Sequence, residues 1–132
     1  MLLNNAFTAA IKMKEDHAEH ERQIDYIEFP ATDLPAVKEF YHGVFGWDFT
    51  DWGEGYTSFR DGRLNGGFAR VEQMPASVAP LVVIYSAQLE VIEDEIKEHG
   101  GRITKETYSF PGGRRFHFKD PAGNQLAVWS DR

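Results

Sequence analysis

The sequence predicts an α+β domain that contains two similar modules, each with the element order strand, helix, strand, strand, strand. Two kinds of periodicity lead to this prediction. Apolar and polar residues alternate in short segments, as in half-buried strands, and one longer segment in each half repeats its apolar residues at helical spacing. Corresponding residues also recur at a similar offset, since Gly101 follows Gly46 by 55 positions and Phe118 follows Phe59 by 59. The chain therefore contains an internal repeat.

The first module begins with a strand at residues 24–30, in which the side chains of one face alternate with those of the other. Thr32 or Asp33 is expected to cap the helix that follows, and Gly46 to end it. An apolar stripe along this helix is expected to be buried. It consists of Val37, Phe40, Tyr41 and Val44. Three short strands with glycine-bearing turns between them complete the module, at residues 47–50, 55–60 and 64–71.

Residues 72–80, which contain two prolines and lack periodicity, are expected to link this module to the second one. A strand is predicted at residues 81–85, and a helix at residues 87–99 that Gly100 and Gly101 end. The apolar stripe of this helix consists of Leu89, Ile92, Ile96 and His99. Three further strands are predicted at residues 102–107, 114–119 and 124–129, with a long loop at 109–113 and an Asp-Pro-Ala-Gly-Asn turn at 120–124.

The domain organisation follows from these boundaries. We expect one domain at residues 24–132, built from modules 24–71 and 81–130, because either module alone would leave one face of its sheet open to water. The two modules are expected to be related by a pseudo-twofold axis and to share a core or a cavity. Residues 1–23 form an extension, of which residues 1–20 are expected to be mobile or weakly docked. Within it, His17 and His20 are expected on a solvated helix face rather than at a metal.

Composition excludes several classes of function. The formal charge of −7 disfavours nucleic acid and anionic membranes as partners, because both require a positive surface. The chain has no cysteine, which excludes disulfides and thiolate chemistry and is typical of a cytoplasmic protein. No signal peptide or membrane span is predicted. The 18 aromatic residues (10 Phe, 5 Tyr and 3 Trp) suggest a pocket lined with aromatic side chains.

Three motifs within this repeat resemble the vicinal oxygen chelate superfamily over residues 24–130. They are Asp33-Leu34 at the helix start, Phe40-Tyr41 with Phe45-Gly46-Trp47 at its end, and Asp120-Pro121-Ala122-Gly123-Asn124 near the terminus. That family includes glyoxalase I, extradiol dioxygenases, fosfomycin-resistance enzymes and bleomycin-resistance proteins. The resemblance implies that the two modules form a U-shaped mixed sheet around a cavity, with the helices outside.

The resemblance also implies where a metal would bind. Metal-dependent members carry ligands at four positions, in the first and last strands of each module. The matching residues here are Tyr26, Gly67, Leu81 and Ala127. Three of these side chains have no donor atom, and neutral tyrosine is a poor ligand for a divalent ion. We therefore expect neither the family metal nor another cofactor.

Residues on the strand faces that would carry these ligands are the candidates for binding a small organic ligand. They are Tyr26, Glu28, Ser58, Tyr85, Arg115, His117, Gln125 and Trp129. Glu28 and His117 are the candidate acid–base groups, and Glu28 would also pair with His117 or Arg115. The structural alternative is that a buried carboxylate paired with arginine, or a strand histidine, only satisfies hydrogen bonds.

These observations favour a homodimeric protein of the cytoplasm that binds or sequesters a small molecule without a metal, as bleomycin-resistance proteins do. An inward glutamate suggests a cationic or aromatic ligand. Two alternatives remain open. One is a glyoxalase- or dioxygenase-like enzyme, a lyase or an oxidoreductase, with displaced metal ligands or metal-free acid–base chemistry. The other is an interaction module whose own side chains fill the cavity.

Overall fold

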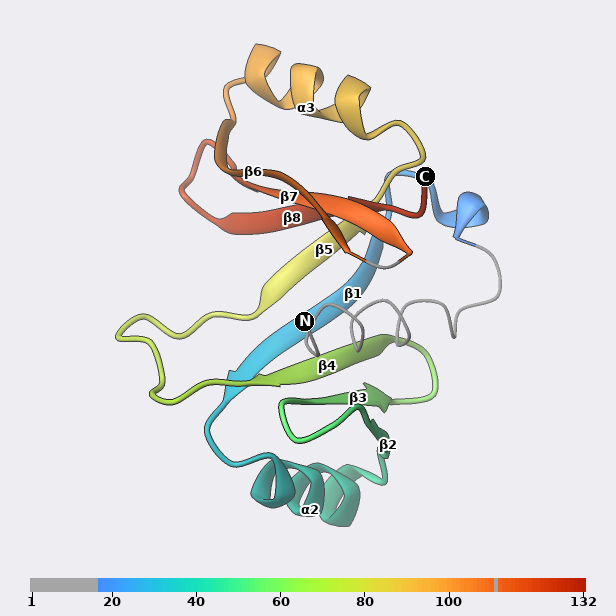
Figure 1. Ribbon diagram of the computed structural model, residues 1–132, viewed down its shortest axis with the longest axis vertical. Helices are drawn as coiled ribbons and strands as arrows, with labels where there is room; N and C mark the ends of the chain where they lie inside the picture. Colours follow the sequence, from blue (N-terminus) through green and yellow to red (C-terminus); the bar gives the residue numbers. More distant parts are fainter. Residues whose placement is uncertain (1–16, 111) are drawn as a thin grey trace. The chain divides into compact units, whose positions relative to one another are not determined.

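The computed structural model describes residues 17–110 and 112–132 and divides into two compact units (Figure 1). Among these residues, the first unit contains 26–80, and the second contains 17–25 together with 81–132. Each unit has the predicted order of strand, helix and three strands. The predicted α+β class is therefore confirmed, whereas the pseudo-twofold arrangement around a cavity stays a prediction.

The first unit is a four-stranded mixed sheet with one helix. Its strands follow the spatial order β2-β3-β4-β1. The pair β1/β4 is parallel, and the pairs β2/β3 and β3/β4 are antiparallel. The elements are β1 (Ile24–Ala31), α2 (Leu34–Phe45), β2 (Asp48–Asp51), β3 (Tyr56–Arg60) and β4 (Asn65–Arg70).

Helix α2 is bounded by the residues that the sequence indicates. The carboxylate of Asp33 accepts a hydrogen bond of 3.0 Å from the backbone N–H of Ala36. Gly46 ends the helix in the left-handed conformation, at φ 74°, which glycine adopts without strain. The helix packs on an aromatic core built from strand residues of one face. This core contains Ala31, Leu34, Phe59 and Phe68, with Phe29, Val37, Tyr41, Trp47 and Phe49 against it.

The expectation that the whole stripe of α2 is buried is wrong for two of its residues. Phe40 is 54% exposed and Val44 is 61% exposed, whereas Val37 and Tyr41 pack on the core. The apolar residues of α2 span a wider arc around the helix axis than the part of the helix surface that faces the sheet. Phe40 and Val44 therefore lie at the uncovered edge of this arc, together with the exposed Phe45.

The second unit repeats this topology. Its strand order is β5-β8-β7-β6, with β5/β8 parallel and the other pairs antiparallel. A 3₁₀ turn, η1 (Ala18–His20), precedes β1 in the chain and belongs to this unit. The remaining elements are β5 (Leu81–Tyr85), α3 (Leu89–Glu98), β6 (Arg102–Phe110), β7 (Gly113–Lys119) and β8 (Gln125–Ser130).

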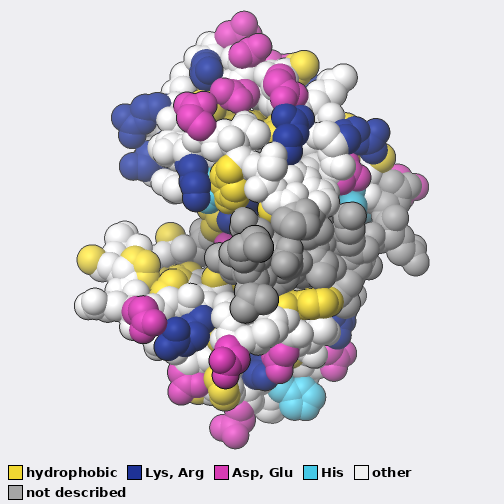
Figure 2. Space-filling model, in the orientation of Figure 1, with side chains coloured by type: hydrophobic (Ala, Val, Ile, Leu, Met, Phe, Trp, Pro, Cys, Tyr) yellow, Lys and Arg dark blue, Asp and Glu magenta, His cyan; other side chains and the backbone are white. Residues whose placement is uncertain are grey.

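Helix α3 covers one face of this second sheet (Figure 1). Its core contains Leu89, Phe116, Phe118 and Val128, with Ile84, Ile92, Ile96, Ile103 and Leu126 against it. His99, expected on the buried stripe, is instead exposed, and its Nδ1 lies 2.9 Å from the carbonyl oxygen of Glu95. Five acidic residues on α3 give its outer surface a negative charge, which Figure 2 shows as the magenta side chains gathered over the helix.

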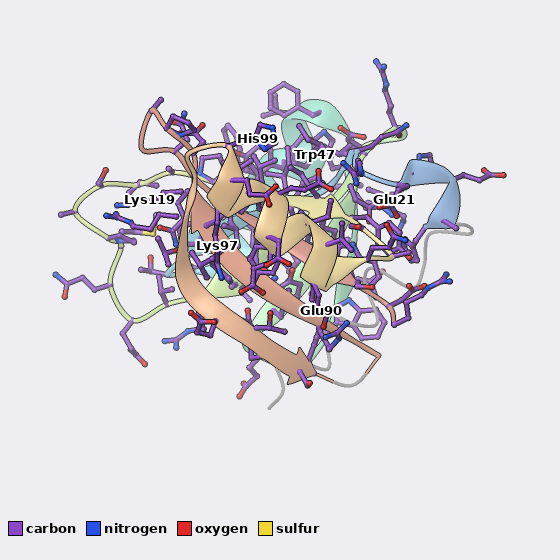
Figure 3. The ribbon with its side chains drawn as sticks, turned by 90° about the horizontal axis from the view of Figure 1, so that it is seen from above. Glu21, Trp47, Glu90, Lys97, His99 and Lys119 are labelled. Atoms are coloured by element: carbon purple, nitrogen blue, oxygen red, sulfur yellow. The ribbon has the colours of Figure 1, made fainter. Side chains whose placement is uncertain are left out.

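Two bidentate ion pairs join α3 to neighbouring segments. Arg22 donates to both carboxylate oxygens of Glu95, at 3.1 and 3.2 Å. Arg114 on β7 likewise donates to both oxygens of Glu90, which Figure 3 labels on α3. Because these pairs lie at the surface, solvent screens them and each contributes little to stability.

The turns confirm the internal repeat and refine its register. Asp61 accepts hydrogen bonds from the backbone of the turn between β3 and β4, and Asp120 does the same between β7 and β8. The second turn is one residue longer, so Asn65 opposite Arg60 corresponds to Gln125 opposite Lys119. The offset is therefore 59 for Phe59 and Phe118, in β3 and β7, and 60 in the last strand of each unit.

The long loop expected at residues 109–113 is shorter in the structure. The β6/β7 ladder continues through Ser109↔Arg114 to Phe110↔Gly113, and only residues 111 and 112 separate the two strands. Cross-strand pairing has thus extended both strands into the segment whose Pro and Gly residues indicated a loop.

Residues 17–23 are part of the second unit rather than a peripheral extension. Arg22 N–H donates to the carbonyl of Tyr85, and Tyr85 N–H donates to that of Gln23, at 2.7 and 3.1 Å. Glu21 accepts hydrogen bonds from the Ser86 hydroxyl and the Ala87 N–H, at 2.6 and 2.7 Å, just before α3. The remainder of the expected extension, residues 1–16, lies outside the described residues. Within the described part of the chain, no helix has the length and apolar composition needed to cross a membrane.

Candidate functional site

In each unit the candidate residues lie on the sheet face opposite the helix. Side chains alternate along a strand, so residues next to the helix-side core residues project to the other face. In the first unit this face carries Tyr26, Glu28, Tyr56, Ser58 and Gly67. In the second unit it carries Val83, Tyr85, Arg115, His117, Gln125, Ala127 and Trp129.

A chain of hydrogen bonds joins Tyr26, Tyr56 and Glu28 in the first unit. The hydroxyl of Tyr56 donates to a carboxylate oxygen of Glu28 at 2.9 Å, and it lies 2.6 Å from the hydroxyl of Tyr26. A tyrosine has one hydroxyl proton, so Tyr26 is the donor in the second bond. Burial raises the pKa of Tyr56 well above its usual value, and the charge of Glu28 acts in the same direction. Tyr56 is therefore a neutral, oriented donor to the carboxylate.

Gly67 provides the space in which the two tyrosine hydroxyls meet. A Cβ atom at this position would lie 2.2 Å from the hydroxyl oxygen of Tyr56 and 2.6 Å from that of Tyr26. Neither distance is possible between non-bonded atoms, so any side chain at position 67 would displace both tyrosines. The glycine and the hydrogen-bonded pair therefore require one another.

Ser58 is held by a neighbouring tryptophan. Its hydroxyl accepts a hydrogen bond of 2.9 Å from the indole N–H of Trp52, and the side chain is buried. This bond gives Trp52 a part in positioning Ser58.

In the second unit, Arg115 and His117 converge on Tyr108. The Nε–H of Arg115 donates to the Tyr108 hydroxyl, and His117 Nε2 lies 3.2 Å from the same oxygen. The ammonium of Lys105 lies 4.4 Å from the centroid of the Tyr108 ring. Arg115 is 8% exposed and His117 is 9% exposed. A buried cation, a second cation and an imidazole thus surround one phenol, and we call Lys105, Tyr108, Arg115 and His117 the basic cluster.

The pKa of His117 reflects these surroundings. Burial lowers it to about 4, and the positive charges of Arg115 and Lys105 add to the effect. The imidazole is therefore neutral at neutral pH and can act as a hydrogen-bond acceptor or a base.

Tyr85 and Trp129 form an aromatic pair with carboxylate partners. The Tyr85 hydroxyl donates to Asp131 at 2.6 Å, and burial followed by this bond raises its pKa to about 12. The indole N–H of Trp129 donates to Asp25 at 3.1 Å. His17, which we expected on a solvated helix face, is 8% exposed and packs its ring edge-on against Trp129, with the ring centroids 4.9 Å apart.

Most of the predicted residues therefore gather in three groups, each within one unit. Tyr26 and Glu28 share a network in the first unit, with Ser58 on the same face. Arg115 and His117 meet at Tyr108, and Tyr85 lies against Trp129 in the second unit. Gln125 is exposed at the start of β8. The acid–base pair suggested between Glu28 and His117 or Arg115 joins residues of different units and stays a prediction.

Sequence reasoning missed the two tyrosines that organise these groups. Tyr56 was within reach, because it precedes Ser58 by two residues on the same strand face. Tyr108 was hidden because β6 has irregular register between Ile103 and Tyr108, which breaks the alternation. Asp25 and Asp131 were also missed as partners of Trp129 and Tyr85.

Gly67 in β4 and Ala127 in β8, two of the positions at which the family resemblance leads us to expect metal ligands, have side chains without donor atoms. Across the parallel pairs, Gly67 lies opposite Glu28 and Ala127 lies opposite Val83. Among residues 17–110 and 112–132, no three His, Cys, Asp or Glu side chains gather in an arrangement that would hold a metal.

Two cavities lie on the helix sides of the sheets. One, of about 730 Å³, adjoins the start of α2 and includes Asp33, Lys38, Asp51 and Arg70 in its lining. The other, of about 390 Å³, lies between α3 and the second sheet, with Ile92, Ile96 and Phe118 among the residues that line it. None of the eight candidate residues lines either cavity.

Comparison with known proteins places this fold in context. A family model described as Glyoxalase/Bleomycin resistance protein/Dioxygenase superfamily matches residues 23–128. Two curated relatives, from Mycobacterium bovis and Mycobacterium tuberculosis and both named "Putative glyoxylase CFP32", are 26% identical over 117 residues. The match covers 80% of this chain and 44% of either relative, so the chain spans less than half the length of these relatives.

Solved structures show the same fold at low sequence identity. The Mn(II)-bound glyoxalase from Novosphingobium aromaticivorans superposes with a TM-score of 0.62 at 18% identity, over 85% of this chain and 40% of that chain. Methylmalonyl-CoA epimerase from Mycobacterium tuberculosis gives a TM-score of 0.62 at 12% identity, over 81% of this chain and 86% of that chain. At these identities the likeness concerns the fold.

Proposed function

Because the chain belongs to the glyoxalase/bleomycin resistance protein/dioxygenase superfamily, we propose that it binds a small organic molecule without the metal site of metal-dependent members. The observation that carries this proposal is the space at Gly67. There the hydroxyls of Tyr26 and Tyr56 occupy the volume that a ligand side chain in β4 would need. A neutral phenol is a weak donor to divalent ions, so the pair does not replace the missing ligands.

Polar groups on the same strand faces support binding of an organic molecule. In the second unit, the guanidinium of Arg115 is oriented by Tyr108. Small-molecule sites combine oriented polar groups of this kind with aromatic walls, and in the same unit Tyr85 and Trp129 are paired aromatic rings of the type that forms such a wall.

The test is a comparison of metal ions with organic ligands on chelator-treated protein. A ligand that binds only the folded protein at one hundred times its Kd adds about 2.7 kcal/mol to the free energy of unfolding. We expect Zn²⁺, Ni²⁺, Mn²⁺ and Fe²⁺ to leave the unfolding transition unchanged, and members of a small-molecule library to raise it. Stoichiometric metal that stabilises the wild type but not Glu28→Gln would overturn the proposal and show that the ligands have moved to new positions.

A second candidate is a metal-free enzyme that transfers a proton, and the hydrogen bond that fixes the half-buried carboxylate of Glu28 favours it. An oriented carboxylate can take a proton from the carbon next to a carbonyl group and return one to it. The methyl protons of pyruvate in D₂O, followed by NMR, would exchange faster with the wild type than with Glu28→Gln. The exposed Glu54→Gln serves as the matched control, and equal exchange rates with and without protein would exclude this candidate.

A further inference from the structure

We propose that the ligand is an organic anion whose carboxylate or phosphate group binds the basic cluster of Lys105, Arg115 and His117 around Tyr108. This inference rests on the proposed function and specifies the chemical class of the ligand. It concerns the hairpin of β6 and β7, so every residue that carries it lies in the second unit.

The backbone register brings these side chains together. Tyr108 lies opposite Arg115, and Lys105 lies opposite His117, across the β6/β7 ladder. The irregular register between Lys105 and Tyr108 inserts one extra residue in β6, so that Lys105 pairs with His117 and Tyr108 pairs with Arg115, two residues apart on one face of β7. The cluster is therefore set by strand pairing, which holds it in place before a ligand arrives.

Arg115 has the properties of an anion-binding arginine. Its side chain is more than nine-tenths buried, and the Nε–H bond to Tyr108 fixes the plane of the guanidinium. A planar guanidinium matches a carboxylate or phosphate with two parallel hydrogen bonds, and fixing it beforehand reduces the entropy lost on binding.

The other members of the cluster increase the positive potential. Lys105 is exposed, and its ammonium lies over the Tyr108 ring. Its flexible side chain can turn toward an anion that binds at Arg115. Burial is the main cause of the low pKa of His117, and the charges of Arg115 and Lys105 lower it further because both disfavour another proton on the imidazole. A bound anion would offset the charges of the arginine and the lysine.

The surroundings of the cluster indicate that the anion has an aromatic or apolar body. Trp129 lies opposite Arg115 in the β7/β8 ladder, and Tyr85 lies opposite Trp129 in the β5/β8 ladder. The rings of Tyr85 and Trp129 lie 5.2 Å apart between centroids. Tryptophan fluorescence should therefore report binding at the cluster.

The expectation of a cationic ligand came from Glu28, but this residue does not determine the charge of a ligand that binds the basic cluster. It belongs to the first unit, and its carboxylate accepts the hydrogen bond of Tyr56. In the second unit, the buried carboxylate of Asp25 accepts the hydrogen bond of Trp129, whereas the buried cation beside Tyr108 is Arg115, and this cation favours an anion.

Three probes that share a phenyl ring and differ in the charged group test the inference. Benzoate and benzamidine have the same size and opposite charge, and phenyl phosphate replaces the carboxylate with a phosphate. Each is titrated into the full chain at constant ionic strength, with tryptophan fluorescence and the unfolding temperature as readouts. We expect benzoate or phenyl phosphate to change the fluorescence and raise the unfolding temperature, and benzamidine to do neither. The probe that binds more tightly shows which anionic group the cluster prefers.

Variants then assign binding to the cluster. Arg115→Gln is expected to weaken binding of the anion by about tenfold or more, because a buried charge-assisted hydrogen-bond pair is lost. Arg115→Lys should give an intermediate affinity. Lys105→Gln, at an exposed position where folding is not at risk, should weaken it by about threefold. Arg102→Gln removes an exposed charge from the same strand and should change the affinity by less than about twofold.

The outcomes separate this inference from the proposed function. Binding of benzamidine alone, or anion binding that Arg115→Gln and Lys105→Gln leave intact, would overturn the anion inference while small-molecule binding stands. If none of the probes binds, the anion inference is also overturned, and the library screen then decides the proposed function. Should Arg115→Gln fail to fold, Lys105→Gln measured against Arg102→Gln gives the decision.

Discussion

The indole N–H of Trp129 donates to the carboxylate of Asp25, 104 residues earlier in the chain, and both side chains are buried. Nδ1 of His17 lies 3.5 Å from the same carboxylate oxygen. A buried carboxylate is costly unless it receives hydrogen bonds, so these contacts make Asp25, at the start of β1, and His17 before it contributors to the stability of the second unit.

Replacing Trp129 with phenylalanine should lower the free energy of unfolding by about 1–3 kcal/mol from the lost hydrogen bond, to which the smaller ring adds. Urea unfolding measures this change. Trp47→Phe is the matched control, because Trp47 is half-buried and stacks between Tyr41 and Phe59 in the first unit. Equal losses in the two variants would show that the bond to Asp25 contributes nothing measurable.

Gly67→Ala should destabilise the fold by about 1–3 kcal/mol, because the added methyl group overlaps the hydroxyls of Tyr56 and Tyr26. Gly55→Ala is the control, since nothing lies within 4 Å of a Cβ atom there. Thermal or urea unfolding compares the two. An alanine at position 67 that is as stable as one at position 55 would mean that the tyrosine pair does not fill this space.

The pH dependence of stability should show the titration of His117. Its pKa in the fold, about 4, is below the ordinary value of 6.5, so the fold favours the neutral imidazole. The stability from this group is complete above pH 6.5 and is lost as the pH falls toward 4, by about 3 kcal/mol in all. The facing groups are Lys105 and Tyr108 on β6 and Arg115 on β7.

The measurement is urea unfolding at pH values between 7 and 4. His117→Gln should flatten the decrease, whereas His99→Gln, at an exposed position, should preserve it. A wild-type slope that His117→Gln leaves unchanged would assign the acid sensitivity to other groups.

The two sides of α2 should respond differently to truncation. Leu34→Ala removes a buried side chain from the core and should cost about 2–4 kcal/mol. Phe40→Ala removes a side chain that is 54% exposed and should cost less than half of that. Urea unfolding at a protein concentration low enough to favour the monomer gives both values. A larger loss for Phe40→Ala would show that another surface covers this residue.

The sequence was sufficient to predict the strands, the helices and the face on which each candidate lies, because alternation and capping are local properties. The strand at Leu81–Tyr85 agrees with the structure residue by residue, and of the two predicted caps of α2, Thr32 and Asp33, the structure has Asp33. The faces of Tyr26, Glu28 and Trp129 follow from the same alternation.

Long-range contacts could not be predicted. Periodicity identifies Phe40 as part of an apolar arc, but the width of the sheet beneath decides whether it is covered. The charged run around His17 indicated a solvated helix. The aromatic partners of His17, Tyr85 and Trp129, lie far along the chain in β5 and β8, so the residues near His17 do not indicate its burial. Tyr108 lies in an irregular stretch of β6, where no pattern assigns its face.

The mutual dependence of Gly67, Tyr26 and Tyr56 has a consequence for protein engineering. A histidine introduced at position 67 alone would collide with both phenols, and a smaller residue in place of either phenol alone would open a void beside the glycine. Each single step is therefore less stable than the starting sequence. We therefore expect that a metal centre engineered at this place would need coordinated changes at the three positions, and that one-at-a-time selection for stable variants would keep the site as it is.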